Sequence, residues 1–388
     1  MSTNATSVDA PGAVKGGLRR VLFHFCIGMG LFLGLEFSIF HTGLYTFVME
    51  PDSYAGRFEL LRAAERGRRL VSGRYALLLG DSRMAEGFWE ELAEEFSAPR
   101  GFHFLNASLN GSNPRVWYYL LREIDPEASR YQAILVPVYS YNDVGRGDQA
   151  DRLIDLRTLN TRLTVADIPE FVSSYRKGSY RILVLRSILL KGSAFKQDLQ
   201  DLLSHPLQRL DRRRLYQRSW RRWRYAYRGR QDSLQGLQYI RETGSLRFPP
   251  GLPERTRQRL EADLKRSSTL PSIPLRQYKN RWFSALVRRY KRSPTRIIFF
   301  RLPRRPIPPP EMDLDSGGAI PQLAEEGKVT LLDPKTFSFL ERPRYFFDGL
   351  HLNGEGRRAF TQALVQSVLP VLRSERQATS SDRKPRRH

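Results

Sequence analysis

Five short apolar runs, bounded by polar and turn-forming residues, constrain the fold of this chain more than any other feature of its sequence. They occupy residues 75–79, 102–105, 133–138, 296–302 and 329–332. Runs of this length are typical of strands that are buried on both faces in a parallel sheet. Helical patterns lie between the first three runs, at residues 86–96 and 114–124. Strands that alternate with helices predict an α/β fold with a doubly wound, five-stranded parallel sheet.

A long apolar segment near the N-terminus predicts a membrane anchor. Residues 21–48 are predominantly apolar, and a helix of about 20 residues spans a bilayer core. Basic residues in segment 1–20 precede this run, whereas Glu50 and Asp52 follow it. The positive-inside rule places residues 1–20 in the cytoplasm and the rest of the chain on the periplasmic or extracellular side. We expect a retained single-pass anchor in the cell membrane, because no signal-peptide cleavage site follows the run.

Glu36 is the residue that argues against a spanning helix. A carboxyl group in hydrocarbon is costly unless it is protonated, paired or near the interface. Glu36 stands toward the C-terminal end of the run, where an interfacial position would lower that cost. A buried helix of a globular domain is the alternative interpretation, and residues 52–73 predict a further helix that leads away from the membrane.

An unusually long segment separates the third and fourth apolar runs. Residues 144–294 exceed an ordinary crossover connection and are rich in arginine and aromatic residues, so they predict a basic, mostly helical insert. The flanking parts, residues 52–143 and 295–373, form one domain in this interpretation. Residues 374–388 are predicted to be a disordered basic tail. Within the insert, residues 209–230 contain ten arginines interleaved with tryptophan and tyrosine.

The chain carries a formal net charge of +24, from 64 Lys and Arg against 40 Asp and Glu. Such an excess suits contact with nucleic acid, anionic lipid or an acidic polymer. Nucleic acid is not expected, because an exported domain rarely meets it and no nucleic-acid motif is visible. A solvated helical face, docking on anionic lipid and recognition of an acidic polymer stay open for the Arg-rich stretch.

The single cysteine, Cys26, excludes disulfides and Cys-based metal sites, and no metal or cofactor is expected.

Four polar clusters follow predicted strands, at the edge where a doubly wound sheet places its ligand site. Ser82 ends a Gly-Asp-Ser tripeptide, where a tight turn into a helix exposes the hydroxyl and leaves N–H groups free. Gly111 closes the polar segment after the second strand, and Asn142 follows the third. Asp348 and His351 are spaced so that the carboxylate can hold one imidazole nitrogen while the other faces the serine. Each signal is weak alone, but a nucleophile, two oxyanion donors and an Asp–His pair in this order indicate acyl chemistry.

This ordered set resembles the SGNH (GDSL-like) hydrolase superfamily, in its membrane-anchored bacterial type. The resemblance implies a flavodoxin-like fold in which Ser82 is the nucleophile, His351 its base and Asp348 the residue that orients the base. It also implies an oxyanion hole formed by the N–H groups of Ser82 and Gly111 and by the side-chain amide of Asn142. The matching segments are Gly-Asp-Ser at 80–82, Asn-Ala-Ser-Leu-Asn-Gly at 106–111, Asn142, and Asp-Gly-Leu-His-Leu-Asn at 348–353.

The resemblance covers residues 75–143 and 296–372 and leaves the insert unexplained. Arg83 follows the serine where the superfamily usually has an apolar residue, and Ser140 and Tyr141 stand where glycines commonly precede the asparagine. Both departures bear on which substrates bind more than on the reaction itself, because the predicted catalytic residues are all present.

The resemblance implies a serine esterase or O-acyltransferase that acts on acyl esters, acetyl esters first, of envelope glycans or lipids. It includes membrane-anchored members that modify cell-surface polysaccharides, some of them beside a multispanning acyl-transfer partner, and such a partner is a hypothesis for this chain. Hydrolysis and transfer both stay open. Two other interpretations stay open as well: a non-catalytic scaffold whose oxyanion pocket Tyr141 blocks, and a basic module that docks on anionic membrane or acidic polymer.

Overall fold

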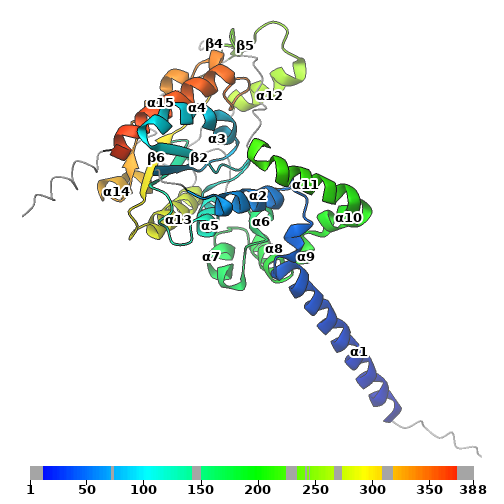
Figure 1. Cartoon of the computed structure of the whole chain (residues 1–388). Helices are drawn as coiled ribbons and strands as arrows, with labels where there is room; N and C mark the ends of the chain where they lie inside the picture. The colour runs from blue at the N-terminus through cyan, green and yellow to red at the C-terminus, as the bar shows by residue number, and fades with distance from the viewer. Residues whose placement is uncertain are drawn as a thin grey trace, which may run out of the picture.

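The structure is a computed structural model that describes residues 12–70, 74–141, 150–223, 234–240, 243, 245–265, 273–307 and 318–373. In this part of the chain a central sheet lies between two layers of helices. A long helix, α1 (Gly12–Glu36), projects away from these layers (Figure 1). The predicted basic tail at 374–388 lies outside the described residues.

The central sheet contains the five strands predicted from the sequence, and all of them run parallel. Their order across the sheet is β2-β1-β3-β6-β7, so β1 lies between the two strands that follow it in the chain. The prediction of an α/β fold with a five-stranded parallel sheet is therefore confirmed. The strands are β1 (Arg74–Leu78), β2 (Phe102–Asn106), β3 (Ala133–Val138), β6 (Arg296–Arg301) and β7 (Thr330–Leu331).

Helices cover both faces of the sheet (Figure 1). On one face lie α2 (Tyr54–Gly67), α5 (Pro114–Ile124), α13 (Ile273–Arg289) and α14 (Ala319–Glu325), and on the other α3 (Ser82–Gly87), α4 (Glu90–Ser97) and α15 (Gly354–Arg373). The sequence predicted one helix over residues 86–96, but the structure has two. Phe88 adopts extended backbone and ends α3, while the N–H of Trp89 donates a 2.9 Å hydrogen bond to Thr361 Oγ1 of α15.

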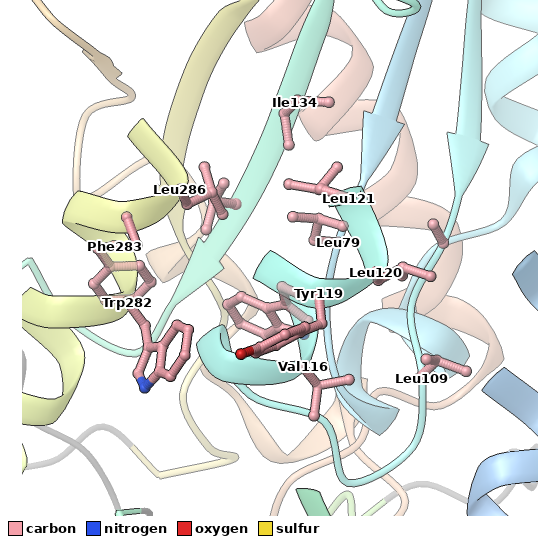
Figure 2. Close-up of a cluster of buried hydrophobic side chains, with 14 of the residues drawn as sticks. Leu79, Leu109, Val116, Tyr119, Leu120, Leu121, Ile134, Trp282, Phe283 and Leu286 are labelled. Atoms are coloured by element: carbon pink, nitrogen blue, oxygen red, sulfur yellow. The ribbon is translucent and has the colours of Figure 1, made fainter. Parts of the chain in front are cut away.

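Alternate side chains of each strand enter different hydrophobic clusters, one on each face of the sheet. In β1, Leu77 belongs to the first cluster and Leu78 to the second, and both are completely buried. Burial on both faces is the reason that the strands have continuous apolar sequences. Figure 2 shows the first cluster, in which Leu121 of α5 and Leu286 of α13 pack near Ile134 of β3.

The segment between β3 and β6 is mostly helical, and it also forms a small antiparallel sheet. Its last helix, α13, packs on the central sheet and so belongs to the sheet's helical layer. The other elements are α6 (Leu153–Leu159), α7 (Ile168–Ser173), α8 (Gly178–Leu189), α9 (Lys191–Ala194), α10 (Lys196–Ser204), α11 (Pro206–Trp223), β4 (Gln238–Ile240), β5 (Ser245–Arg247) and α12 (Glu254–Lys265). The same segment contains a short turn of helix, η4 (Val165–Asp167), and further short turns elsewhere are η2 (Leu44–Phe47), η3 (Ala98–Arg100), η5 (Ser338–Leu340) and η6 (Pro343–Tyr345).

One helix among the described residues, Arg19–His41, is long and apolar enough to cross a membrane. It combines most of α1 with a π-helical turn, η1 (Phe37–His41). The sequence predicted an anchor that extends to residue 48, but the helix ends at His41. Gly43, with φ of +86°, turns the chain, and Tyr45 is buried against the insert. Glu36 is paired at this end of the helix, because its Oε1 accepts a 2.8 Å hydrogen bond from the N–H of Gly192.

Candidate active site

Ser82 stands at the turn from β1 into α3. Asp81 is the N-cap of that helix, and its Oδ1 accepts a 3.0 Å hydrogen bond from the N–H of Arg83. No side chain fits at Gly80, because an added Cβ would lie 2.3 Å from the Cβ of Met84. Ser82 is therefore held as the first residue of α3, where its own N–H has no acceptor within the helix.

Asp348 and His351 lie in the loop between η6 and α15. Asp348 Oδ1 accepts hydrogen bonds from the backbone N–H groups of Leu350 and His351, both at 2.7 Å. The ring of Phe347 stacks on the imidazole, with ring centroids 5.8 Å apart. The N–H of Phe347 also donates a 3.2 Å hydrogen bond to the carbonyl oxygen of His351. The loop is thus held by its own backbone, and the carboxylate and the imidazole have fixed relative positions.

The fold brings this loop to Ser82, 269 positions earlier in the chain. Ser82 Oγ lies 2.9 Å from His351 Nε2. On the other side of the ring, His351 Nδ1 lies 2.9 Å from Asp348 Oδ2 and 3.1 Å from Asp348 Oδ1. These are hydrogen-bond distances, so a hydroxyl, a base and an orienting carboxylate form one continuous chain. The structure brings together the three residues that the sequence predicted to be catalytic.

The charges around His351 favour its protonated form. Burial lowers the pKa of the imidazole, but the hydrogen bond and the charge of Asp348 outweigh burial, so the net pKa is raised above the ordinary 6.5. Burial likewise raises the pKa of Asp348, and hydrogen bonds from His351 reverse that effect and leave it below the usual 3.8. Asp348 therefore stays ionised while His351 takes up a proton.

The loop after β2 is tied to the turn that carries Ser82. The carbonyl oxygen of Gly80 accepts a 2.9 Å hydrogen bond from the N–H of Leu109 and a 2.7 Å hydrogen bond from Ser112 Oγ. Between these two residues, Gly111 has φ of +72°, a left-handed conformation that favours glycine. The segment predicted to supply an oxyanion donor therefore runs beside the Ser82 turn.

Asn142, the other predicted oxyanion donor, lies outside the described residues. Its neighbour Tyr141 is 2% exposed and belongs to the first hydrophobic cluster. Its hydroxyl donates a 2.5 Å hydrogen bond to the carbonyl oxygen of Leu332 and a 3.3 Å bond to that of Phe299. The ring of Tyr141 is thus part of the core and does not line the cavity beside Ser82.

Ser82 opens onto a cavity of about 210 Å³ at the carboxyl ends of β1 and β3. The chain leaves β1 toward β2 on one side and later returns to β3 on the other, and ligands of doubly wound sheets bind at such switch points. The insert supplies Arg152, Lys279 and Phe283 to the cavity wall. The other lining residues are Asp81, Arg83, Ser112, Asn113, Pro114, Trp117, Pro137, Val138, Tyr139, Ser140 and Leu350.

Sequence reasoning missed the contribution of the insert to this cavity. Arg152 and Lys279 stand in no motif, and many other basic residues surround them in the sequence. Arg83 was noted only as a departure from the superfamily pattern, and in the structure it forms a 2.8 Å ion pair with Asp81. Three cationic side chains therefore lie on the cavity wall, and Arg83 is paired with Asp81.

Within the described ranges, no group of three or more His, Cys, Asp or Glu side chains is arranged to hold a metal ion. No protein-family model matches the chain, and no curated protein matches it either.

Proposed function

We propose that this protein is a membrane-anchored serine esterase or O-acyltransferase of the SGNH (GDSL-like) type, with acyl esters, acetyl esters first, as substrates. The observation that carries the proposal is the hydrogen-bonded chain from Ser82 through His351 to Asp348. When the strands of the sheet are numbered along the chain, their order is 2-1-3-4-5. This order supports the flavodoxin-like fold that the resemblance implies.

In the proposed reaction, His351 Nε2 accepts the proton of Ser82 as the serine oxygen attacks the ester carbonyl. Asp348 stabilises the resulting imidazolium. The N–H groups of Ser82 and Gly111 and the side-chain amide of Asn142 donate hydrogen bonds to the oxyanion. The imidazolium then protonates the leaving alcohol, and an acyl-serine remains. Water or a sugar hydroxyl then attacks the acyl-serine and gives its proton to His351, and His351 returns that proton to the Ser82 oxygen as the acyl–serine bond breaks.

The apolar N-terminal helix supports a location at the cell membrane. We place the α/β domain on the periplasmic or extracellular side because basic residues precede the helix and Glu50 and Asp52 follow it. The substrate would then be an acylated envelope glycan or lipid. A multispanning membrane protein that delivers acyl groups remains the partner we propose for a transfer reaction. Purified protein, an acyl donor and a soluble glycan distinguish the two reactions, because a transferase acylates the glycan and an esterase releases the free acid.

Labelling of the full-length protein by a fluorophosphonate probe in detergent tests whether the Ser82 hydroxyl is activated. We expect the wild type to be labelled and Ser82→Ala to be unlabelled, with hydrolysis of p-nitrophenyl acetate reduced by about 10³-fold or more. Ser338→Ala, which changes an exposed serine far along the sequence, is the matched control and should be labelled like the wild type. Equal labelling and equal hydrolysis in the wild type and Ser82→Ala would remove the assignment.

The alternative of a basic binding module receives less support from the described part of the Arg-rich stretch. Arg209, its first arginine, is completely buried and forms ion pairs with Glu50 and Asp198, both at 3.0 Å. Arg212 is bound to Glu50 at 3.1 Å. These two arginines hold the protein's own segments together, which leaves them little part in binding a polyanion.

A further inference from the structure

A stripe of apolar side chains is exposed on α8. Ile182, Leu185 and Leu189 are 71%, 36% and 46% exposed, and their spacing of three and seven residues puts them on one face of the helix. On the opposite face, Val184 and Ile188 are completely buried. A surface helix in contact with water normally has polar residues on its outer face. α8 is apolar on both faces, so its outer stripe marks an interaction surface.

Arginines flank this stripe on both sides. At about 100° of rotation per residue, Arg186 lies to one side of Ile182 and Arg181 to the other, and both are exposed. One N–H of Arg181 donates to the carbonyl oxygen of Tyr175 at 2.6 Å. Helices that lie in a membrane interface have this pattern, because the apolar stripe enters the lipid while the cationic ends reach the headgroups.

α8 adjoins the end of the candidate membrane-spanning helix. Gly192 of α9, the next helix, is bonded to Glu36, and the ring of Phe195 stacks on Phe40 with centroids 6.1 Å apart. In Figure 1, α8, α9 and α10 gather around the inner end of α1, and the central sheet lies beyond them. The turn η2, at the same end, exposes Leu44 (57%) and Phe47 (64%).

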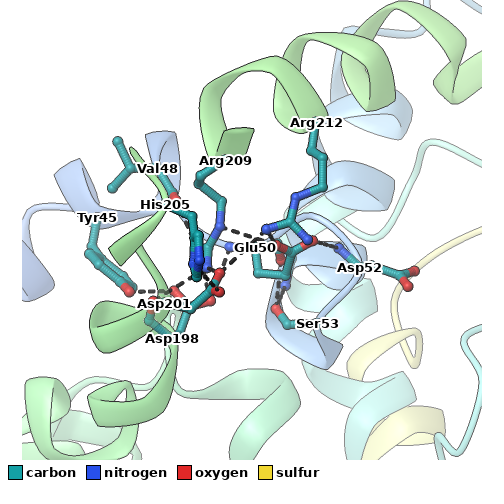
Figure 3. Close-up of polar contacts among 11 residues, drawn as sticks. Tyr45, Val48, Glu50, Asp52, Ser53, Asp198, Asp201, His205, Arg209 and Arg212 are labelled. Carbon is teal, nitrogen blue, oxygen red and sulfur yellow. Dashed lines mark hydrogen bonds and ion pairs between the residues drawn. The ribbon is translucent and has the colours of Figure 1, made fainter. Parts of the chain in front are cut away.

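A polar network joins the segment after the helix to the insert (Figure 3). Buried Arg209 of α11 donates a 3.2 Å hydrogen bond to the carbonyl oxygen of Val48 and forms ion pairs with Glu50 and Asp198. The hydroxyl of Tyr45 donates to Asp198 as well. These contacts fix the direction of α1 relative to the domain, so the spanning helix is not a loose tether.

We propose that Leu44, Phe47, Ile182, Leu185 and Leu189 form a membrane-seating surface, which lies in the lipid headgroup region of the bilayer that α1 crosses. This inference rests on the anchoring part of the proposed function, and it adds a fixed orientation of the domain on the lipid. A second protein could also cover an apolar stripe. Two observations favour the bilayer: the surface continues from the end of the spanning helix, and the charge of its flanking arginines is opposite to that of anionic headgroups.

Quenching by brominated lipids tests the membrane-seating surface in the full-length protein. Cys26→Ser provides a background without cysteine, and a fluorophore is attached at Ile182→Cys or Leu189→Cys in nanodiscs of brominated phosphatidylcholine and phosphatidylglycerol. Leu31→Cys, inside the spanning helix, is the positive control. Glu325→Cys, exposed on α14 at the far side of the molecule, is the negative control (Figure 1). We expect labels at residues 182 and 189 to lose about half of their fluorescence or more, and the label at 325 to lose none.

Two results would overturn the proposal, and they differ in what else they remove. Strong quenching at residue 31, with residues 182 and 189 as unaffected as residue 325, would leave the anchor in place but remove the seating surface. In that case, if the labels at residues 182 and 189 were shielded from a water-soluble quencher in native membranes, the stripe would be assigned to a protein partner instead. Absence of quenching at residue 31 would remove the anchor as well. Neither result affects the fluorophosphonate test of Ser82, so a failure of the catalytic proposal is seen separately.

Discussion

Among single residues, Asp348 has the largest influence on the chemistry open to His351. A general base must be neutral to accept a proton, and Asp348 raises the pKa of His351 above 6.5. The rate of hydrolysis should therefore increase with pH as His351 loses its proton. The midpoint of this increase should lie above pH 6.5, because the pKa of His351 is raised. Asp348→Asn removes the charge, so we predict that the acid limb of kcat/KM against pH moves to lower pH while kcat falls about 10²–10⁴-fold. Hydrolysis of p-nitrophenyl acetate, followed across neutral pH, measures both effects.

Glu325→Gln removes an exposed carboxylate on α14 and serves as the control for this profile. It should leave both the acid limb and kcat as they are in the wild type. If Asp348→Asn kept the acid limb of the wild type, the raised pKa of His351 would need a source other than Asp348.

Arg152 and Lys279, the two cationic residues that the insert contributes to the cavity wall, predict a preference for negatively charged substrates. Lys279 is 7% exposed and lines the cavity with Arg152, so an anionic group on the ester would be attracted to that wall. We predict that Lys279→Met raises KM for an ester that bears a carboxylate by about five- to tenfold, and raises it much less for a neutral ester. Lys291→Met, an exposed lysine beyond the end of α13, is the control. Equal changes for both esters would indicate that Lys279 only shapes the cavity.

The turn that carries Ser82 and the loop that carries Asp348 and His351 could be predicted from the sequence because each is locally determined. Gly80 and Asp81 determine the turn that carries Ser82, and the Asp348 carboxylate is held by N–H groups two and three residues later. Arg152 and Phe283 could not be predicted in the same way. They reach the cavity only because the insert packs against the sheet, and no local pattern records that packing.

At the scale of elements, one buried ion pair connects α5 of the sheet layer to α6 of the insert. Arg115 and Asp155 are both fully buried, and two N–H groups of Arg115 donate to Asp155 Oδ2 at 2.9 and 2.7 Å. The guanidinium also donates to Ser174 Oγ at 2.8 Å and lies 4.0 Å from the ring centre of Tyr175. A single arginine thus holds two parts of the insert, α6 and the segment at residues 174–175, against the domain.

We predict that Arg115→Met lowers the free energy of unfolding by about 3–5 kcal/mol, because it leaves the Asp155 carboxylate buried without its cation. Urea unfolding of the full-length protein in detergent, followed by tryptophan fluorescence, measures the change. Arg344→Met is the matched control. Arg344 and its partner Glu355 are each 52% exposed, so its loss should move the midpoint little. A similar midpoint for both variants would show that the insert is held mainly by its apolar contacts.

Elements were predictable where one physical cause determined them. The strands were found because burial on both faces makes their sequences continuously apolar, and α5 was found because Pro114 begins it. The ends of α1 and α3 were not, because tertiary contacts decide them. Residues 44–49 are as apolar as a spanning helix, yet Tyr45 and Met49 pack on Phe195 of the insert instead.

For the whole molecule, the insert is the part that connects the candidate active site to the candidate membrane-spanning helix. It lines the cavity through Arg152 and Lys279, carries the exposed stripe of α8, and holds the segment after the candidate membrane-spanning helix through Arg209. The orientation of the domain relative to α1 therefore depends on contacts far from Ser82. This dependence can be tested without measuring catalysis.

We predict that Arg209→Met loosens the join between α1 and the domain, because it removes the cation that binds Glu50 and Asp198 together. Spin labels at Leu31→Cys and Gln322→Cys, with Cys26→Ser and in detergent, report the distance between α1 and α14. The wild type should give one narrow distance distribution, and Arg209→Met a broad one. Arg212→Met, which removes a 46% exposed cation from Glu50 and Asp201, should give a narrow distribution. A broad distribution already in the wild type would make α1 a flexible tether. A narrow distribution in Arg209→Met would indicate that α1 is held against the domain by Glu36 and the aromatic contacts of Phe40.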